Sequence, residues 1–291
     1  MFEGVYPAVV TPFLSDPQQS LDLEGFRSNI EALLAAGVHG IVPTGSTGES
    51  ATLSFEEHER VVEVAVETAG GKIPVLAGTG SNNTAEALRF TRAAKEIGAD
   101  GALLISPYYN KPNRAGLFQH FTKIADLDIP VVLYNVPGRT GQNLAPDLVI
   151  ELATHPNIVG IKEASGNVGQ VSQIIEGTLD EEFAVISGDD NLTLPILALG
   201  GEGVISVAAN VEPVRMVRLY EAFRAGDWTG ALELHYELSP LFRALFIDTN
   251  PIPVKKAVGL RGMAAGPVRL PLSDLDDEKT AALAEVLSRY D

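Results

Sequence analysis

The sequence of 291 residues contains no cysteine. Disulfides, catalytic thiolates and cysteine-based zinc sites are therefore excluded. The five histidines, at positions 39, 58, 120, 155 and 235, are scattered singly, and none has the His-x-x-x-His or histidine–carboxylate spacing of a metal site. We therefore expect a mechanism that uses no metal.

Basic residues and long apolar runs are also scarce. Thirty-eight acidic against 21 basic residues give a net charge of −17, which opposes binding to nucleic acids and to anionic membranes. No apolar run approaches the roughly 20 residues of a transmembrane helix. Residues 1–4 lack the basic and then apolar segments of a secretion signal. We therefore expect a cytoplasmic protein with no nucleic-acid or membrane partner.

Short apolar runs alternate with amphipathic stretches along most of the chain. Each run is almost continuously apolar, which is typical of parallel strands covered on both faces. The predicted strands are residues 5–10, 40–42, 74–77, 101–105, 129–134, 158–162, 183–186 and 203–207. The predicted helices that follow them are residues 23–36, 55–68, 84–97, 114–125, 146–153, 168–176, 191–199 and 213–225, and Thr84 is the expected N-cap of the third helix.

Eight βα units in this length predict an α/β fold, a (β/α)8 TIM barrel, which typically takes roughly 250 residues. A doubly wound open sheet is the alternative, but no Gly-x-Gly-x-x-Gly follows the first strand. We expect the catalytic barrel to span residues 1–225. Residues 226–291 are predicted to form a helical extension packed on the barrel, with helices at 229–246, 253–260 and 276–289.

A lysine, Lys162, stands near the end of the sixth predicted strand. Because lysine is costly to bury, one interpretation places Lys162 in solvent just past the strand. The other places it at the mouth of a buried strand, where desolvation lowers the pKa of the amine and frees it to attack a carbonyl as a Schiff-base nucleophile. The residues at the other strand ends bear on this choice.

Catalytic groups of a barrel lie at the carboxyl ends of its strands. The glycine-rich loop 44–50 follows the second strand and offers backbone N–H groups to an anion, although turns use glycine in any case. Tyr108 and Tyr109 follow the fourth strand. Tyr134 ends the fifth strand, and Arg139, five residues later, can hold a carboxylate through two parallel hydrogen bonds.

An amine, phenols, an arginine and an N–H nest on one face suit a keto acid. The nest takes the carboxylate, the lysine attacks the ketone, and a tyrosine transfers protons. The resulting iminium withdraws electrons, so the adjacent carbon loses a proton and becomes an enamine nucleophile. This is class I aldolase chemistry, which needs no metal.

With these residues in view, the chain resembles the pyruvate-dependent class I aldolases, and most closely the dihydrodipicolinate synthase family. The resemblance covers nearly the whole chain and favours the catalytic interpretation of Lys162. The matching motifs lie, in family order, at residues 10–13, 45–50, 77–80, 106–112, 134–141, 160–166, 187–190, 203–206 and 250–255.

The resemblance implies a role for each residue of the site. Lys162 would form the Schiff base with pyruvate, Tyr134 would be the general acid and base, and Thr47 would be the central member of a hydroxyl relay. Tyr109 would complete the relay from a neighbouring subunit, so a dimer would be the smallest active unit, usually within a dimer of dimers. Arg139 would bind the carboxylate of aspartate semialdehyde.

The substrate pocket is implied in the same way. Backbone groups at Ser46 and Thr47 would receive the pyruvate carboxylate, and Gly188 and Ile205 would line the pocket. Most synthases have threonine at the position of Ser46. Serine keeps the hydroxyl and loses a methyl group, so we expect small changes in the properties of the site and no change in its chemistry. The implied product, 4-hydroxy-tetrahydrodipicolinate, commits carbon to lysine and diaminopimelate, and no cofactor is implied.

A feedback site for lysine at the subunit interface is also implied. Phe55 stands where lysine-sensitive enzymes often have histidine, so sensitivity to lysine is a hypothesis. The residues that match the lysine-binding cleft are Ser50, Ala51, His58, Asn82, Glu86 and Tyr108.

Two other functions are compatible with parts of the sequence. An N-acetylneuraminate lyase or a 2-keto-3-deoxy sugar acid aldolase would share the Schiff base and take a longer polyol aldehyde. Arg139 and the motif at residues 250–255 favour the synthase over both. A catalytically silent barrel that serves as a sensor is disfavoured by the intact set of lysine, tyrosines and threonine.

Overall fold

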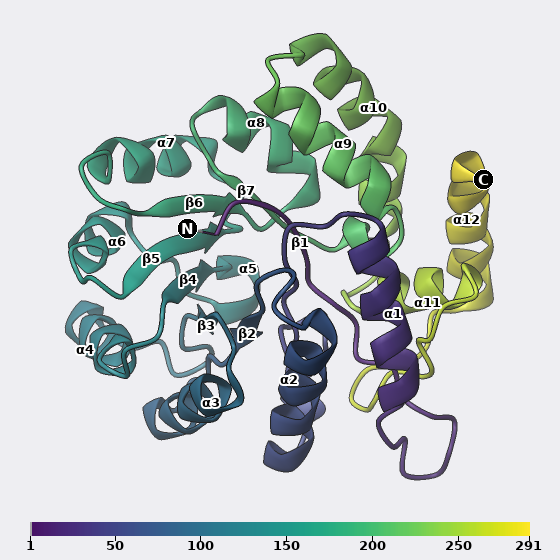
Figure 1. Cartoon of the computed structure of the whole chain (residues 1–291), viewed down its shortest axis with the longest axis horizontal. Coiled ribbons are helices and arrows are strands. Elements are labelled where there is room, and N and C mark those ends of the chain that lie inside the picture. The colour runs from purple at the N-terminus through teal and green to yellow at the C-terminus, as the bar shows by residue number, and fades with distance from the viewer. Residues whose placement is uncertain (1) are drawn as a thin grey trace.

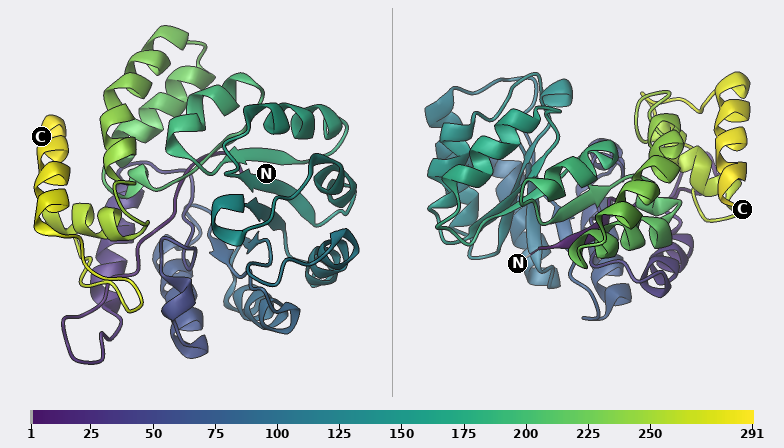
Figure 2. Two further views of the ribbon diagram at one scale, coloured as in Figure 1. Left: turned by 180° about the vertical axis from the view of Figure 1, so that it is seen from behind. Right: turned by 90° about the horizontal axis from the view of Figure 1, so that it is seen from above.

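The computed structural model describes residues 2–291. Seven parallel strands form one curled sheet in the order β1-β7-β6-β5-β4-β3-β2, and helices surround it (Figures 1 and 2). The strands are β1 (Gly4–Pro7), β2 (Leu76–Gly78), β3 (Gly101–Ile105), β4 (Val131–Asn135), β5 (Ile158–Glu163), β6 (Ala184–Ser187) and β7 (Gly203–Ser206).

A short segment lies between the two ends of this sheet, β1 and β2. One isolated parallel bridge joins Ala8 to Val42, and a second joins Ile41 to Val75. The extended run stops there because Thr44 adopts a left-handed φ of 54°. The predicted second strand is therefore reduced to these two bridges.

The helices that follow the strands agree with the predicted ranges to within a few residues. They are α1 (Leu23–Ala35), α2 (Phe55–Ala69), α3 (Thr84–Ile97), α4 (Arg114–Ala125), α6 (Pro146–Ala153), α7 (Val168–Gly177), α8 (Thr193–Ala198) and α9 (Pro213–Arg224). A short helix, α5 (Pro137–Thr140), was not predicted. Within residues 2–291, no helix is both long and apolar enough to cross a membrane.

The N-cap of α3 is Asn83, so the prediction of Thr84 is wrong. Asn83 Oδ1 accepts a hydrogen bond from Ala85 N at 3.0 Å, and asparagine is a stronger N-cap than threonine. The hydroxyl of Thr84 instead hydrogen-bonds to His120 Nδ1 at 2.9 Å. The threonine thus ties α3 to α4.

The chain ends in three further helices, α10 (Trp228–Ala244), α11 (Ile252–Leu260) and α12 (Asp277–Leu287). A buried ion pair links this part of the chain to the loop at residues 44–50. Lys255 Nζ lies 2.7 Å from Glu49 Oε1, and the two side chains are 2% and 1% exposed. Glu49 Oε2 also accepts from Arg269 N at 2.9 Å. Breaking such an ion pair would leave an uncompensated charge in the interior. The pair therefore holds the loop firmly against the C-terminal helices.

The register of β4 and β5 decides which of their side chains share a face of the sheet. Tyr134 pairs with Lys162, and Asn135 pairs with Glu163. Side chains alternate along a strand, so Tyr134 and Lys162 share one face. The other face carries Asn135 and Glu163, and the Glu163 carboxylate accepts hydrogen bonds from Asn135 and from Gln170 of α7.

Candidate active site

A cavity of about 140 Å³ lies at the carboxyl ends of the strands. Its lining includes residues of β4, β5 and α5. It also includes residues of two loops, one that follows the segment at residues 41–42 and one that follows β6. Six of the residues predicted for the site line it: Ser46, Thr47, Tyr134, Arg139, Lys162 and Gly188.

The side chain of Lys162 is buried at this cavity, with 6% of its surface exposed. Its interpretation as a solvated loop residue is therefore wrong. Lys162 Nζ lies 4.3 Å from the ring centroid of Tyr134. Burial lowers the pKa of Lys162 to about 7, with a smaller opposing effect from the Asp190 carboxylate. A large fraction of the amine is thus neutral near pH 7, and a neutral amine can attack a carbonyl.

Tyr134 presents a phenol to the same cavity and is 8% exposed. Burial raises the pKa of Tyr134 to about 12, and the nearby positive charge of Arg139 partly opposes this effect. The phenol is therefore protonated in its resting state. It is suited to donate a proton to a developing oxyanion and to take one back.

Thr47 is 4% exposed and accepts a hydrogen bond on Oγ1 from Asn250 Nδ2 at 3.0 Å. The loop that carries Thr47 is held by hydrogen bonds from both sides. Thr11 Oγ1 donates to Gly48 O at 2.7 Å, and Thr44 Oγ1 donates to Gly78 O at 3.0 Å. These contacts fix the threonine hydroxyl at the rim of the sheet.

Arg139 projects from α5 beside the cavity, and its side chain is exposed to solvent. Arg139 Nη2 donates to Asn250 O at 2.8 Å. The remaining guanidinium donors are available to an anionic group of a ligand. The short helix itself was missed from sequence because four residues are too few to show helical periodicity.

Gly188 follows β6 and lies against Lys162. A Cβ atom at Gly188 would lie 3.0 Å from both Cε and Cγ of Lys162 and 2.8 Å from Cβ of Ala164. Any larger residue would press the lysine out of place. Ile205 lies in β7 among buried apolar side chains that include Tyr134, and the lining of the cavity does not include it.

Asp190, which follows β6, was not singled out from the sequence. Its carboxylate is buried and accepts from Ser206 Oγ at 2.5 Å, Val207 N at 3.0 Å and Ala208 N at 2.9 Å. Burial raises the pKa of Asp190 to about 6, and these hydrogen bonds oppose that rise. The carboxylate ties the end of β6 to the end of β7. Its negative charge also favours the ammonium form of Lys162.

Glu163 follows Lys162 in β5 and anchors the end of the strand. Its carboxylate accepts from Ser165 N at 2.6 Å, Asn135 Nδ2 at 2.9 Å and Gln170 Nε2 at 3.0 Å. These donors satisfy a carboxylate that is only 2% exposed. The hydrogen bonds of Glu163 thus fix the backbone next to Lys162.

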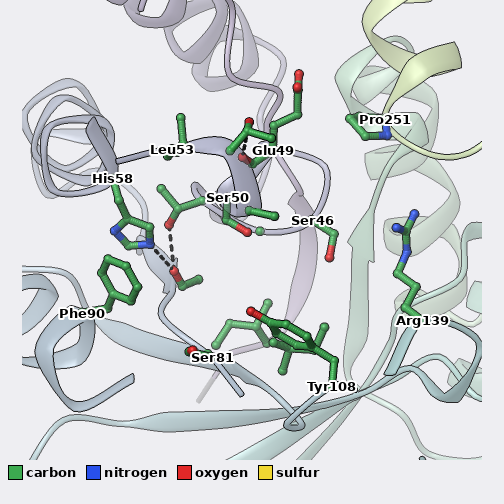
Figure 3. Close-up of a pocket in the computed structure, with 18 of the residues that line it drawn as sticks. Ser46, Glu49, Ser50, Leu53, His58, Ser81, Phe90, Tyr108, Arg139 and Pro251 are labelled. Carbon is green, nitrogen blue, oxygen red and sulfur yellow. Dashed lines mark hydrogen bonds between the residues drawn. The ribbon is translucent and has the colours of Figure 1, made fainter. Parts of the chain in front are cut away.

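A larger cavity of about 610 Å³ adjoins the first (Figure 3). The two cavities share Ser46, Tyr134, Arg139 and Asn250. Five of the six residues predicted to bind lysine line the larger cavity: Ser50, Ala51, His58, Glu86 and Tyr108. The sixth, Asn82, is not among the lining residues and donates from Nδ2 to Tyr108 O at 3.1 Å.

His58 forms part of the inner wall of the larger cavity. Its ring stacks on Phe90 with 4.1 Å between centroids, and Nε2 lies 2.8 Å from Gly78 O. Burial lowers the pKa of His58 to about 4. The imidazole is therefore neutral at pH 7, and its Nε2–H donates to the carbonyl.

Tyr109 lies outside both cavities and is 89% exposed. Its backbone takes a left-handed φ of 73°. A single chain therefore does not bring Tyr109 together with Tyr134 and Thr47. Within residues 2–291, no cluster of three or more histidine or carboxylate side chains is arranged to hold a metal ion.

The chain is similar to known proteins along its whole length. The model of the Dihydrodipicolinate synthetase family matches residues 1–290. The 4-hydroxy-tetrahydrodipicolinate synthase of Methanoculleus marisnigri is 74% identical over 290 residues, with 100% of both chains covered. The synthase of Methanosphaerula palustris is 72% identical over 291 residues, again with 100% of both chains covered.

Solved structures of the same kind resemble the fold closely. The crystal structure of dihydrodipicolinate synthase from Aquifex aeolicus has a TM-score of 0.96 and 47% sequence identity, and covers 99% of this chain and 98% of that chain. The crystal structure of the Cyanidioschyzon merolae enzyme with lysine bound has a TM-score of 0.95 and 42% identity, with 99% and 98% covered.

Proposed function

Because this chain belongs to the Dihydrodipicolinate synthetase family, we propose that it condenses pyruvate with L-aspartate 4-semialdehyde to give 4-hydroxy-tetrahydrodipicolinate. It is a lyase of the class I aldolase type, and its product enters lysine and diaminopimelate biosynthesis. The observation that carries this proposal is the buried Lys162, whose pKa is lowered to about 7, beside the phenol of Tyr134. The reaction takes place on this lysine and uses no cofactor.

The first half of the proposed reaction activates pyruvate. The neutral amine of Lys162 adds to the keto carbon, and the oxygen leaves as water after Tyr134 gives it a proton. The iminium withdraws electrons from the methyl group, which loses a proton to the Tyr134 phenolate and restores the phenol. The enamine formed in this way is the carbon nucleophile.

The second half joins the two substrates. The enamine carbon attacks the aldehyde carbon, and Tyr134 protonates the aldehyde oxygen as the new carbon–carbon bond forms. The amino group of the former aspartate semialdehyde then attacks the iminium carbon and closes the ring, the bond from that carbon to Lys162 breaks and leaves the lysine as a free amine, and the Tyr134 phenolate takes up the proton that is released. Thr47 and the backbone at Ser46 lie on the wall where the pyruvate carboxylate is received, and both line the cavity.

The proton relay is proposed to need a second copy of the chain. Tyr109 is 89% exposed, so its phenol is free to enter the site of a neighbouring subunit and complete the relay through Thr47. A dimer is then the smallest active unit, within a dimer of dimers. If the chain sedimented as a monomer and had full activity under the same conditions, this arrangement would be excluded.

Arg139 is proposed to hold the carboxylate of aspartate semialdehyde. Replacing Arg139 with alanine removes a charge-assisted pair, so we expect the KM for the aldehyde to rise by about 10- to 100-fold. The formation of the Schiff base with pyruvate should be unchanged. Steady-state kinetics with varied aldehyde, together with borohydride trapping of pyruvate, measure the two effects separately.

A matched control for this variant is Arg114→Ala. Arg114 is an exposed arginine on α4 that pairs with Asp147 and Glu151, away from the cavity lining. It should leave the KM unchanged. If Arg139→Ala kept its KM for aspartate semialdehyde while the chain turned over polyol aldehydes, the sugar acid aldolase alternative would replace the synthase.

We further infer that the sheet is a closed (β/α)8 barrel of residues 1–225, with residues 226–291 as a helical extension. The bridges from Val42 to β1 and from Ile41 to the residue before β2 support closure through a short eighth strand. The buried Lys255–Glu49 pair supports an extension that packs on the barrel.

The larger cavity is proposed as a regulatory site for lysine. Ser50, Glu86 and Tyr108 line it, and the carboxylate of Glu86 can pair with a ligand ammonium. The structure of the related Cyanidioschyzon merolae enzyme has lysine bound, which supports the same ligand here. Phe55 also lines this cavity and packs under Arg89 at 4.0 Å.

Titration of the activity with L-lysine tests this site. We expect saturable inhibition at millimolar or lower concentrations, and Glu86→Gln should weaken it because the ammonium loses its charged partner. Glu96→Gln on the exposed face of the same helix is the control and should behave like the native chain. Activity that did not respond to lysine at millimolar levels would remove the proposal.

A further inference from the structure

Asn250 connects two groups of the site that come from distant parts of the chain. Its side-chain Nδ2 donates to Thr47 Oγ1 at 3.0 Å, and its backbone oxygen accepts from Arg139 Nη2 at 2.8 Å. The residue is 6% exposed and lines both cavities. One asparagine therefore contacts both the proposed relay hydroxyl and the proposed anchor of the aldehyde.

The other end of the same amide is unsatisfied. Asn250 Oδ1 is buried and has no hydrogen-bond partner among residues 2–291. A buried oxygen without a donor lowers stability, and an apolar side chain in its place would avoid that loss. The amide is therefore a poor choice for stability alone, and its one hydrogen bond is directed to Thr47.

A second contact holds the asparagine in register with the threonine. Lys255, five residues after Asn250, pairs with Glu49, two residues after Thr47, at 2.7 Å in a fully buried setting. Lys255 Nζ also donates to Pro267 O at 2.7 Å. A hydrogen bond and an ion pair thus join the segment 250–255 to the loop 44–50. They fix the amide of Asn250 relative to the hydroxyl of Thr47.

We propose that Asn250 is a positioning residue for the condensation and acts through the hydroxyl of Thr47. An amide N–H donates and cannot accept, so it occupies one lone pair of Thr47 Oγ1 and leaves the hydroxyl proton free to be passed on. A group that relays a proton gains rate from such a fixed orientation. This inference rests on the proposed function of Thr47 in the synthase reaction.

Asn250→Ala separates the side-chain contact from the backbone contact. The variant loses the hydrogen bond to Thr47 but keeps the carbonyl that accepts from Arg139. We expect kcat to fall by about 10- to 100-fold, while the KM for aspartate semialdehyde changes little. The melting temperature should not fall. Arg139→Ala shows the opposite kinetic pattern.

Asn250→Asp keeps the shape of the side chain and replaces the donor by an acceptor. The carboxylate would accept a hydrogen bond from the Thr47 hydroxyl and so occupy the proton that the relay passes on, and kcat should again fall. Its negative charge in the shared cavity would favour the ammonium form of Lys162, so the acidic limb of the pH profile of kcat/KM for pyruvate should move to higher pH. This shift reports the position of the new charge beside Lys162, whereas the fall in kcat reports the loss of the donor to Thr47.

A double-mutant cycle tests whether the effect passes through Thr47. Asn250→Ala should lower kcat in the native chain and have no further effect in the Thr47→Val background. Asn157→Asp is the matched control, since Asn157 Nδ2 donates to Ala125 O at 3.0 Å and Asn157 precedes the first residue of β5, whereas Lys162 stands near the other end of that strand. This control should keep native kcat.

The possible outcomes are distinct. Unchanged kcat in Asn250→Ala, or a loss that is fully additive with Thr47→Val, overturns the positioning role and leaves the proposed function standing. A native chain that neither condenses the two substrates nor traps pyruvate on Lys162 overturns both. A fall in kcat that disappears in the Thr47→Val background, at native melting temperature, supports the positioning role.

Discussion

We expect the replacement of Lys162 with methionine to abolish condensation and to make the folded chain more stable. Activity is lost because no other group in the cavity can form an iminium with pyruvate. Stability rises because folding lowers the pKa of this amine from 10.5 to about 7. The unfolded chain therefore binds more protons, and burying the lysine costs roughly 5 kcal/mol below pH 7.

The pH dependence of this gain has a definite sign. The folded pKa lies below the unfolded one, so the cost is complete below about pH 7 and disappears as the pH rises towards 10.5. Thermal unfolding should therefore show a larger gain for Lys162→Met at pH 7 than at pH 10. Lys123→Met, on an exposed position of α4, is the control and should change neither activity nor this dependence. Residual condensation in Lys162→Met, or a loss of stability, would count against a desolvated nucleophile.

We expect the replacement of Tyr134 with phenylalanine to lower kcat by about 10²- to 10⁴-fold, the usual contribution of a general acid and base. The ring still packs beside Lys162, so the fold and the binding of pyruvate are retained. Exchange of the pyruvate methyl protons with deuterated solvent, followed by NMR, should slow to a similar extent. This exchange reports enamine formation alone and does not need the aldehyde.

Tyr236→Phe provides the control for this substitution, since Tyr236 is 67% exposed on α10 and lies away from both cavities. It should exchange protons at the native rate. If Tyr134→Phe also exchanged at the native rate, another group would be the acid and base, and the role given to the raised pKa of Tyr134 would be wrong.

The elements of the fold could be predicted from the sequence because their signals are local. Apolar runs and helical periodicity gave the seven strands and the long helices to within a few residues. The second strand was overestimated because Thr44 turns the chain at a φ of 54°, which an apolar run does not reveal. The four-residue α5, which carries Arg139, was too short to predict.

Three of the predicted catalytic groups, Lys162, Tyr134 and Thr47, line one cavity, and the fourth, Tyr109, lies outside it. The contacts that support these groups were not foreseen. Asn250 and Thr47 are 203 residues apart in sequence, and Lys255 and Glu49 are 206 apart. No local pattern relates such positions. Asp190 was likewise missed, because its partners on β7 and the following turn lie in another strand unit. The role proposed for Tyr109 requires a second copy of the chain, which a sequence pattern cannot describe.

The most direct test of the account is mass spectrometry of the chain after incubation with pyruvate and borohydride, followed by peptide mapping. We expect one reduced pyruvyl adduct, on Lys162, whose rate of formation rises as the pH increases through about 7. Lys255 is an internal comparison, because it is also buried but is paired with Glu49, and it should remain unmodified. No adduct, or an adduct on a lysine other than Lys162, would contradict the proposed mechanism.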